Sequence, residues 1–435
     1  MIGAFANIFK IPELKRRVIF TAIMLAVYRV GTMIPTPGVD GAQIANWFSQ
    51  QQGTIFGMFS MFSGGAMERG SVFALGIMPY ISASIILQLL TVVIPHLERL
   101  SKEGEVGRRK ITQYTRYGTV VLSLFQGYMI AYALEQGLLG GGAVLTPGLY
   151  FRLMTMITLT AGTAFIMWLG EQISERGIGN GISLIIFAGI VARMPVAIIR
   201  LTQQSFEQDR GVLKIVPILA VMVAVIGFII YVERAQRKIP IQHAKRVIGR
   251  KMYGGVSTHL PLRINTAGVI PPIFASSILM FPTTITQFFP DNSILQRLND
   301  WMQPTALLYN LVYVGLIIFF CYFYTAVTFN PVDVAENLKK TGAYVPGRRP
   351  GKATADYIDK ILTRITFGGA LYVATICVLP TILIAQFNVP FYFGGTSLLI
   401  VVGVALDTIQ QLESHMLTRH YDGFLGGKGK FKGRK

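Results

Sequence analysis

The residues of this chain that could do chemistry are few, and their spacing fits none of the common catalytic or metal sites. All five histidines fall in predicted loops or in the tail: His96, His243, His259, His415 and His420. No HExxH, GxSxG or paired-carboxylate pattern occurs, and "GGAMERG" and "GIGNGIS" lack the Lys-Ser/Thr ending of a phosphate-binding loop. The two cysteines lie in separate apolar runs, which indicates neither a disulfide framework nor a CxxC metal site. The sequence therefore predicts no enzyme active site and no cofactor.

The composition is typical of a polytopic membrane protein. Of 435 residues, 52% are hydrophobic and only 14% are charged, whereas a soluble protein has roughly 25% charged residues. Lys and Arg outnumber Asp and Glu by 40 to 21, which gives a net charge of +19. This excess predicts basic loops on one face of the membrane, or an acidic partner there such as anionic lipid, protein or RNA.

Ten apolar runs have the length of about 20 residues that a membrane helix needs. They cover approximately 18–35, 72–94, 114–134, 150–170, 181–202, 213–232, 267–288, 306–327, 366–384 and 395–413. Nine or eleven spans are the alternatives, because the fourth and ninth runs are polar at one end. With ten spans, 32 of the 40 Lys and Arg residues fall on the side of both termini, which predicts cytoplasmic termini. The first run lacks an A-x-A-like cleavage site, so we expect it to be a retained span.

One twelve-residue pattern occurs twice. "GIMPYISASIIL" starts at Gly76 and "GVIPPIFASSIL" at Gly268, with seven identical positions at an offset of 192 residues. The copies begin the second and seventh spans, which run in opposite directions, so they predict an inverted repeat with a functional site between the halves. Chance recurrence of Gly, Pro and Ser in membrane helices is the alternative. Pro79 and Pro271 each lack a backbone donor, so we expect each to disturb its helix on a side that faces protein or water.

Ionisable groups are nearly absent from the predicted spans. Arg29 and Arg193 are isolated there, and Glu171 and Asp407 lie near or within span ends. Transporters usually keep paired charges inside the membrane, which counts against a secondary transporter with a midplane site. That class, a non-transporting scaffold or insertase, and an intramembrane enzyme remain the alternatives. The apolar segment 56–70 is either a short re-entrant segment or a packed outer loop.

Six longer passages together resemble the SecY family, the channel subunits of the bacterial protein translocon. They are "MFSGGAMERGSVFALGIMPYISASII", "GRRKITQYTRYGT", "WLGEQISERGIGNGISLIIFAGIV", "STHLPLRINTAGVIPPIFASSI", "FNPVDVAENLKKTGAYVPGRRPG" and "FYFGGTSLLIVVGVALD". The resemblance implies an all-α polytopic membrane protein with ten helices in two inverted five-helix halves around a central hourglass pore, and a short plug helix. The implied function is a protein-conducting channel, which passes unfolded secretory polypeptides across the cytoplasmic membrane and releases transmembrane segments laterally into it.

The resemblance also implies how the chain is divided. The first half would cover 18–202, with the plug near 56–70, and the second half would cover 213–413, after an external linker at 203–212. Basic cytoplasmic loops would lie at 233–266 and 328–365. Residues 1–17 and 414–435 would be the cytoplasmic N-terminus and tail.

Four sets of site residues follow from the resemblance. An aliphatic ring would seal the waist of the pore: Ile77, Ile81, Ile182, Ile186, Ile273 and Ile400. The plug would include Phe59, Phe62, Gly64 and Gly65, with the glycines allowing a hinge. The lateral gate would include Ser82, Ser84, Gln88, Ser276, Ser277 and Phe281, although such serines also suit ordinary helix contacts. Cytoplasmic partners would dock at Arg250, Lys251, Arg348 and Arg349, although cytoplasmic loops are basic in any case.

The implied partners belong to the Sec pathway and to protein synthesis. SecE and SecG would be membrane subunits, and the SecA motor ATPase or the ribosome with its nascent chain would supply energy, because no nucleotide site is visible. Signal peptides, anionic lipid, SecD, SecF and YidC are further expected partners. No metal or cofactor is implied. The expected location is the bacterial cytoplasmic (inner) membrane.

Overall fold

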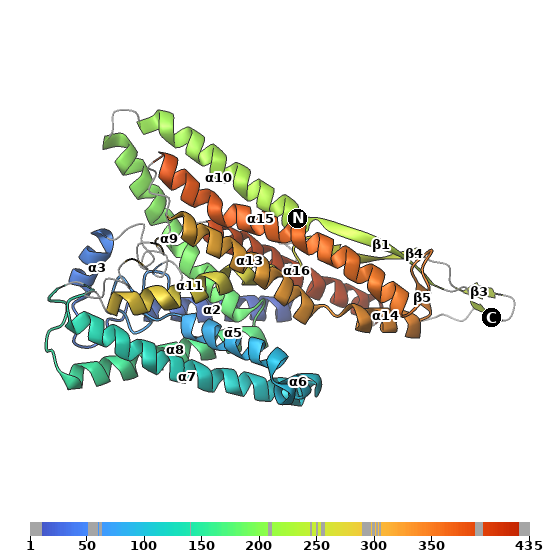
Figure 1. Cartoon of the computed structure of the whole chain (residues 1–435), viewed down its shortest axis with the longest axis horizontal. Helices are drawn as coiled ribbons and strands as arrows, with labels where there is room; N and C mark the ends of the chain where they lie inside the picture. The colour runs from blue at the N-terminus through green and yellow to red at the C-terminus, as the bar shows by residue number, and fades with distance from the viewer. Residues whose placement is uncertain are drawn as a thin grey trace, which may run out of the picture. The chain divides into compact units, whose positions relative to one another are not determined.

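The computed structural model describes residues 11–50, 60, 63–139, 141–207, 211–243, 246–248, 251–253, 257–288, 297, 301, 303, 306–387 and 395–425. The described chain is mostly helical (Figure 1). It forms two compact units, of which the first comprises Met1–Val196 with Val404–Lys435 and the second comprises Ala197–Gly403.

A helix overlaps each of the ten predicted apolar runs. In chain order these helices are α2 (Pro12–Gly31), α5 (Met78–Val93), α7 (Glu105–Glu135), α8 (Leu149–Arg176), α9 (Gly181–Glu207), α10 (Gly211–Arg234), α11 (Ile270–Phe288), α13 (Leu307–Thr328), α15 (Lys352–Phe387) and α16 (Gly395–Leu425). Within the described residues, five helices are long and apolar enough to cross a bilayer. A sixth span results if α5 counts together with α6 (Pro95–Lys102), which follows it at a bend of 101°. The chain is thus built as a multi-pass membrane protein, and the count of ten spans stays a prediction.

Short strands and short helices lie in the segments between the apolar runs of this mostly helical chain. Within the predicted loop 233–266, strands β1 (Gln236–His243) and β4 (Ser257–Arg263) pair antiparallel, with Gln236 opposite Arg263. Strand β5 (Ala343–Tyr344) pairs with the other edge of β1, and β2 (Arg246–Ile248) pairs with β3 (Lys251–Tyr253). Two short helices, α3 (Gly41–Gln50) and α14 (Pro331–Lys340), also lie outside the predicted spans.

The pattern of β1 explains why this loop forms a sheet. Its sequence QRKIPIQH buries Ile239 and Ile241 and exposes the residue on either side of each. This is the alternation of a strand with one buried face. Ile239 packs with Leu262, Val345 and Ile358 in one apolar cluster, so the sheet is fixed to the first turns of α15.

Helix α7 packs against α5 and α8 through a stripe of small residues (Figure 1). The buried members of this stripe recur at every fourth position: Thr115, Thr119, Ser123, Gly127 and Ala131. A Cβ added to Gly127 would lie 3.3 Å from the carbonyl oxygen of Met156 in α8. Small residues at this spacing let helix backbones approach closely within a membrane, and they hold these helices together in the first unit.

Candidate functional site

The two copies of the repeat have the same local backbone. Gly76 and Gly268 both adopt positive φ, at 57° and 64°, and α5 and α11 each begin two residues later, at Met78 and Ile270. The two helix starts therefore differ by the same offset as the sequence match. A side chain in this left-handed conformation costs roughly 1–2 kcal/mol, which gives the shared glycine a structural reason.

The prolines of the repeat begin these helices, so the expectation that Pro79 and Pro271 disturb them is wrong. Pro79 lies in the first turn of α5, and Pro271 and Pro272 lie in the first turn of α11. The first N–H groups of a helix have no acceptor inside the helix, so proline costs no hydrogen bond there. The proline inside α11 is Pro282. Residues 72–77, predicted as part of the second span, form turns.

The predicted ring isoleucines lie on four helices or directly before them. Five of them are at most 7% exposed: Ile77, Ile81, Ile186, Ile273 and Ile400. Ile182 is half-buried at the start of α9. Ile81 and Ile273 each lie three residues after the first residue of their helix, so the repeat gives them equivalent positions. Four ring residues belong to the first unit and two, Ile273 and Ile400, to the second.

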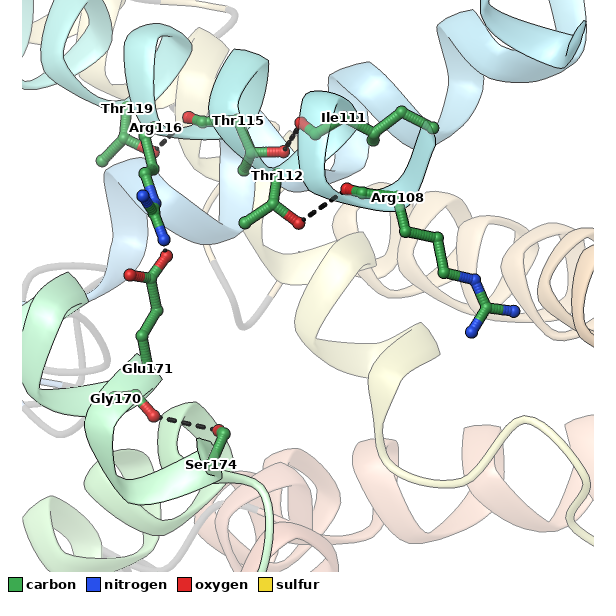
Figure 2. Close-up of polar contacts among 9 residues, drawn as sticks. All are labelled: Arg108, Ile111, Thr112, Thr115, Arg116, Thr119, Gly170, Glu171 and Ser174. Atoms are coloured by element: carbon green, nitrogen blue, oxygen red, sulfur yellow. Dashed lines mark hydrogen bonds and ion pairs between the residues drawn. The ribbon is translucent and has the colours of Figure 1, made fainter. Parts of the chain in front are cut away.

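The start of α9 is tied to the end of α8. Ser174 Oγ accepts a hydrogen bond from the amide of Gly181 at 2.9 Å. It also donates one to the carbonyl of Gly170 at 2.9 Å, which Figure 2 shows. A Cβ at Gly181 would lie 1.9 Å from that same carbonyl oxygen, so this close approach requires glycine. Asn180 Oδ1 accepts from the amide of Ile182 at 3.1 Å, as a helix N-cap does. These contacts fix the position of Ile182 relative to α8.

An ion pair joins α7 and α8 beside this junction. Arg116 Nε donates to Glu171 Oε1 at 2.8 Å, and the two side chains point toward each other in Figure 2. Along α7, Thr112, Thr115 and Thr119 each donate a hydroxyl hydrogen bond to the carbonyl four residues earlier. The ion pair therefore braces the helix on which the start of α9 depends.

The predicted plug is described only in part, at residues 60 and 63–70, and we refer to these residues as the plug segment. Residues 63–70 form turns, so the helix expected over 56–70 does not extend through them. Gly64 and Gly65 have positive φ, at 65° and 84°. Ser60 and Ser63 are fully buried. Phe59 and Phe62 lie outside the described residues.

Arg29 and Arg193 both contact the plug segment, so the expectation that they are isolated is wrong. Arg29 Nη1 donates to the carbonyl of Gly64 at 3.1 Å. Arg193 Nη1 donates to Ser60 Oγ at 2.6 Å, and its Nη2 donates to Glu68 Oε1 at 2.5 Å. Sequence reasoning missed these partners because they lie at least 35 positions away in the chain, beyond any helical periodicity.

The predicted gate serines differ between the two helices. On α5, Ser82, Ser84 and Gln88 are half-buried. On α11, Ser276 and Ser277 are buried, and both donate to the carbonyl of Ile273, at 2.9 and 2.8 Å. A hydroxyl that bonds back to its own helix has used its single donor and tends to bend the helix slightly. The side chain of Phe281 lies outside the described residues.

Two of the predicted docking arginines lie in an exposed turn between β5 and α15. Arg348 and Arg349 are exposed, and the Arg348 guanidinium lies 5.1 Å from the centroid of the Tyr357 ring. Gly347 and Gly351, on either side, have positive φ of 76° and 102°. The tight turn thus presents two cations on a defined backbone.

The other two docking residues are less fully described. Lys251 is the first residue of β3, and its backbone pairs with that of Ile248. Arg250 lies outside the described residues. Among the described residues, no group of three or more His, Cys, Asp and Glu side chains could hold a metal ion. The described residues thus offer buried apolar positions, polar contacts to the plug segment and one exposed basic turn.

The sequence matches one family along most of its length. The family model named SecY matches residues 71–409. Protein translocase subunit SecY of Escherichia coli (strain K12) is 53% identical over 416 residues, which cover 95% of this chain and 94% of the relative. Protein translocase subunit SecY of Vibrio cholerae is 52% identical over 421 residues, with the same coverage of both chains.

Solved channel structures share the fold. A protein-conducting channel superposes with a TM-score of 0.68 at 19% identity, covering 96% of this chain and 95% of the other. Sec61 in the canine ribosome–channel complex gives a TM-score of 0.63 at 17% identity, with the same coverage. At these identities the likeness shows the fold, and the closer sequence relatives show the family.

Proposed function

The chain belongs to the SecY family and is the subunit of a protein-conducting channel, and we propose that the isoleucine ring and the plug segment close its pore. The channel translocates unfolded polypeptides across a membrane and releases transmembrane segments laterally into lipid. The transporter alternative has no support from these relatives. Nor are Arg29 and Arg193 the midplane pair of a transporter, because both contact the plug segment.

One observation carries this assignment of the pore residues. The helices α5 and α11 begin at equivalent points of the repeat, each after a glycine of positive φ. Each helix carries an isoleucine three residues after its own first residue. Two related helices that present Ile81 and Ile273 in this way suit two sides of one constriction. The remaining ring positions, directly before α5 and on α9 and α16, are likewise buried or half-buried.

An isoleucine ring suits a seal that must fit many polypeptides. An apolar constriction resists wetting, and so it resists ion flow without any charged gate. Aliphatic side chains can also repack around a passing chain of any sequence. We propose that no catalytic group takes part in conduction.

The lateral gate is proposed between α5 and α11, at Ser82, Ser84, Gln88, Ser276, Ser277 and Phe281. An exit toward lipid would sort segments by partition alone. Each Leu-like residue favours the bilayer by roughly 0.3–0.6 kcal/mol, while one central Lys or Arg costs roughly 2.5–3.5 kcal/mol. An apolar segment would leave through the gate, and a charged segment would continue across the membrane.

We propose that SecA or the ribosome docks at Arg250, Lys251, Arg348 and Arg349 and supplies energy, since the sequence contains no phosphate-binding loop motif. A guanidinium can bind phosphate or carboxylate in a bidentate way, which lysine cannot. The exposed turn at Arg348 and Arg349 supports this role. Membership of the SecY family is the reason to propose further partners. They are SecE and SecG as membrane subunits, signal peptides, anionic lipid, SecD, SecF and YidC. The bacterial relatives favour a location in the inner membrane. The basic loops favour an orientation with both termini in the cytoplasm.

Cysteine cross-linking to an arrested polypeptide tests the pore assignment. In a background of Cys321→Ala and Cys377→Ala, single cysteines would replace the ring isoleucines Ile81, Ile186 and Ile273. We expect each to cross-link to a secretory polypeptide that is halted in transit by a folded domain. Matched cysteines at the exposed residues Ile86, Ile199 and Ile278, on the same three helices, should not cross-link.

The contrast between the two sets decides the outcome. Equal cross-linking of both sets, or cross-linking of the exposed set alone, would show that the polypeptide does not pass specifically through the ring. Efficient export by each variant would confirm that the substituted channels are assembled.

A further inference from the structure

One face of α9 carries both the predicted ring and the contacts to the plug segment. Ile182, Ile186, Gly189 and Arg193 follow at intervals of four, three and four residues, which places them on one stripe of the helix. Gly189 leaves room for the plug segment, since a Cβ on Gly64 would lie 2.9 Å from the Gly189 Cα. Arg193 lies about 10 Å beyond Ile186 along the axis, at 1.5 Å per residue.

Arg193 bridges two side chains of the plug segment. Its Nη1 donates to Ser60 Oγ at 2.6 Å and its Nη2 to Glu68 Oε1 at 2.5 Å. The side chains of Arg193 and Glu68 are 20% and 28% exposed, and Ser60 is fully buried. Charge-assisted hydrogen bonds of this length are among the strongest in proteins. One guanidinium thus joins both ends of the segment to α9.

Helix α2 also contacts the plug segment, but its hydrogen bonds go to backbone atoms and not to side chains. Arg29 donates to the carbonyl of Gly64 at 3.1 Å, and the Tyr28 hydroxyl donates to the carbonyl of Ser63 at 3.2 Å. Both acceptors are backbone atoms, which are present whatever the side chains of the segment are. The contacts of Arg193 depend on the chemistry of Ser60 and Glu68, so substitution can remove or exchange them.

We propose that Arg193 is a positioning residue of the closed channel, which holds the plug segment on the ring-bearing face of α9 through its ion pair with Glu68. This inference rests on the proposed function, because it assumes that the segment closes the pore. Loss of the ion pair would release the segment while leaving every ring isoleucine in place. The strength of this pair would therefore set how often the resting channel opens.

Resting ion flux into vesicles that contain the purified complex tests this role. Arg193→Gln and Glu68→Gln each remove the ion pair, and we expect each to raise the flux about tenfold or more as the open population grows. The exchange variant Arg193→Glu with Glu68→Arg restores opposite charges and should return the flux toward the wild-type value. Arg109→Gln is the matched control, because it removes an exposed ion pair with Glu105, at 3.9 Å, outside the plug segment, and it should leave the flux unchanged.

Hydrogen exchange of the amides of residues 63–70 provides a readout of the segment itself. We expect faster exchange in Arg193→Gln and in Glu68→Gln, and slow exchange again in the charge-exchange variant. Glu68→Gln keeps the size of a partly exposed side chain, so it tests the proposal even where Arg193→Gln assembles poorly. Wild-type flux and exchange in Glu68→Gln, or no recovery in an assembled exchange variant, would overturn the proposal.

A ring variant separates this inference from the proposed function. Ile81→Gly with Ile186→Gly should raise the flux whether or not Arg193 anchors the segment. If the ring variant leaks and neither Arg193→Gln nor Glu68→Gln does, the role of Arg193 is overturned and the pore assignment stands. If none of the three variants leaks, the pore assignment is overturned, and with it the role of Arg193 in closing the pore.

Discussion

The two copies of the repeat begin their helices with one backbone but have different neighbours. Beside Gly76 lies the plug segment, since a Cβ on Gly76 would lie 3.3 Å from the Cβ of Ser63. Beside Gly268, the side chain of Asn265 donates to the Gly268 carbonyl at 3.0 Å and to Glu233 Oε1 at 2.7 Å. The first helix start is thus fitted to a loop, and the second is tied to α10.

The same contrast holds at the position three residues before each glycine. The first copy has Phe73, which stacks with Tyr28 and Phe165 at centroid distances of 6.1 and 6.0 Å. A Cβ on Gly31 would lie 2.0 Å from the Phe73 ring, so Gly31 makes room for it. The second copy has Asn265 there. A duplicated helix start can therefore keep its backbone while its side chains serve an aromatic core in one half and a polar junction in the other.

The largest expected effect comes from removing the aromatic support of the first copy. Phe73→Ala should lower the stability of the protein by roughly 3–5 kcal/mol, because it opens a cavity against Tyr28 and Phe165. Thermal unfolding in detergent measures this loss. Phe125→Ala is the control, since Phe125 is 52% exposed, and an equal loss in both variants would show that the Phe73 contacts do not support α5.

The polar junction of the second copy should show an intermediate effect. Asn265→Ala removes the hydrogen bonds to Gly268 and Glu233, and we expect a loss of roughly 1–3 kcal/mol in the same unfolding assay. Glu233→Gln keeps an oxygen acceptor and should cost less than Asn265→Ala. A larger loss in Glu233→Gln would mean that the charge of Glu233, and not its bond to Asn265, matters at this junction.

The smallest stability effect should come from substituting the two glycines. Ion flux, and not stability, should then distinguish the first copy of the repeat from the second. Gly76→Ala and Gly268→Ala should each cost roughly 1–2 kcal/mol, because both residues have positive φ. Only Gly76→Ala should also raise resting ion flux, because its new Cβ would press on Ser63 of the plug segment. Equal flux in the two variants would remove the distinction drawn between the copies.

The features set by local pattern could be predicted from the sequence. The apolar runs located a helix in each case, and the repeat at Gly76 and Gly268 corresponds to one backbone conformation used twice. The prediction for Pro79 and Pro271 is wrong because α5 and α11 begin later than the apolar runs do. A proline in a first turn costs no hydrogen bond, whereas one in a helix interior does. The strand β1 has only two buried positions, Ile239 and Ile241, and this alternation is too short to predict a strand among so many basic residues.

The features set by distant contacts could not be predicted. Nothing local to Arg193 reveals Glu68, which lies 125 positions earlier and meets it only in the fold. The ion pair of Arg116 and Glu171 spans 55 positions in the same way. The ring and gate assignments came from family resemblance, and they stay predictions until the pore is measured.

Single-channel conductance of the purified complex tests closure by ring and plug most directly. The variant lacks residues 62–67 and carries Ile81→Gly, Ile186→Gly and Ile273→Gly. The control carries Ile86→Gly, Ile199→Gly and Ile278→Gly on the same helices, at exposed positions. We predict that the wild type and the control are silent and that the variant conducts ions. A silent variant that is folded and inserted, or a control that conducts equally, would contradict closure of the pore by these residues.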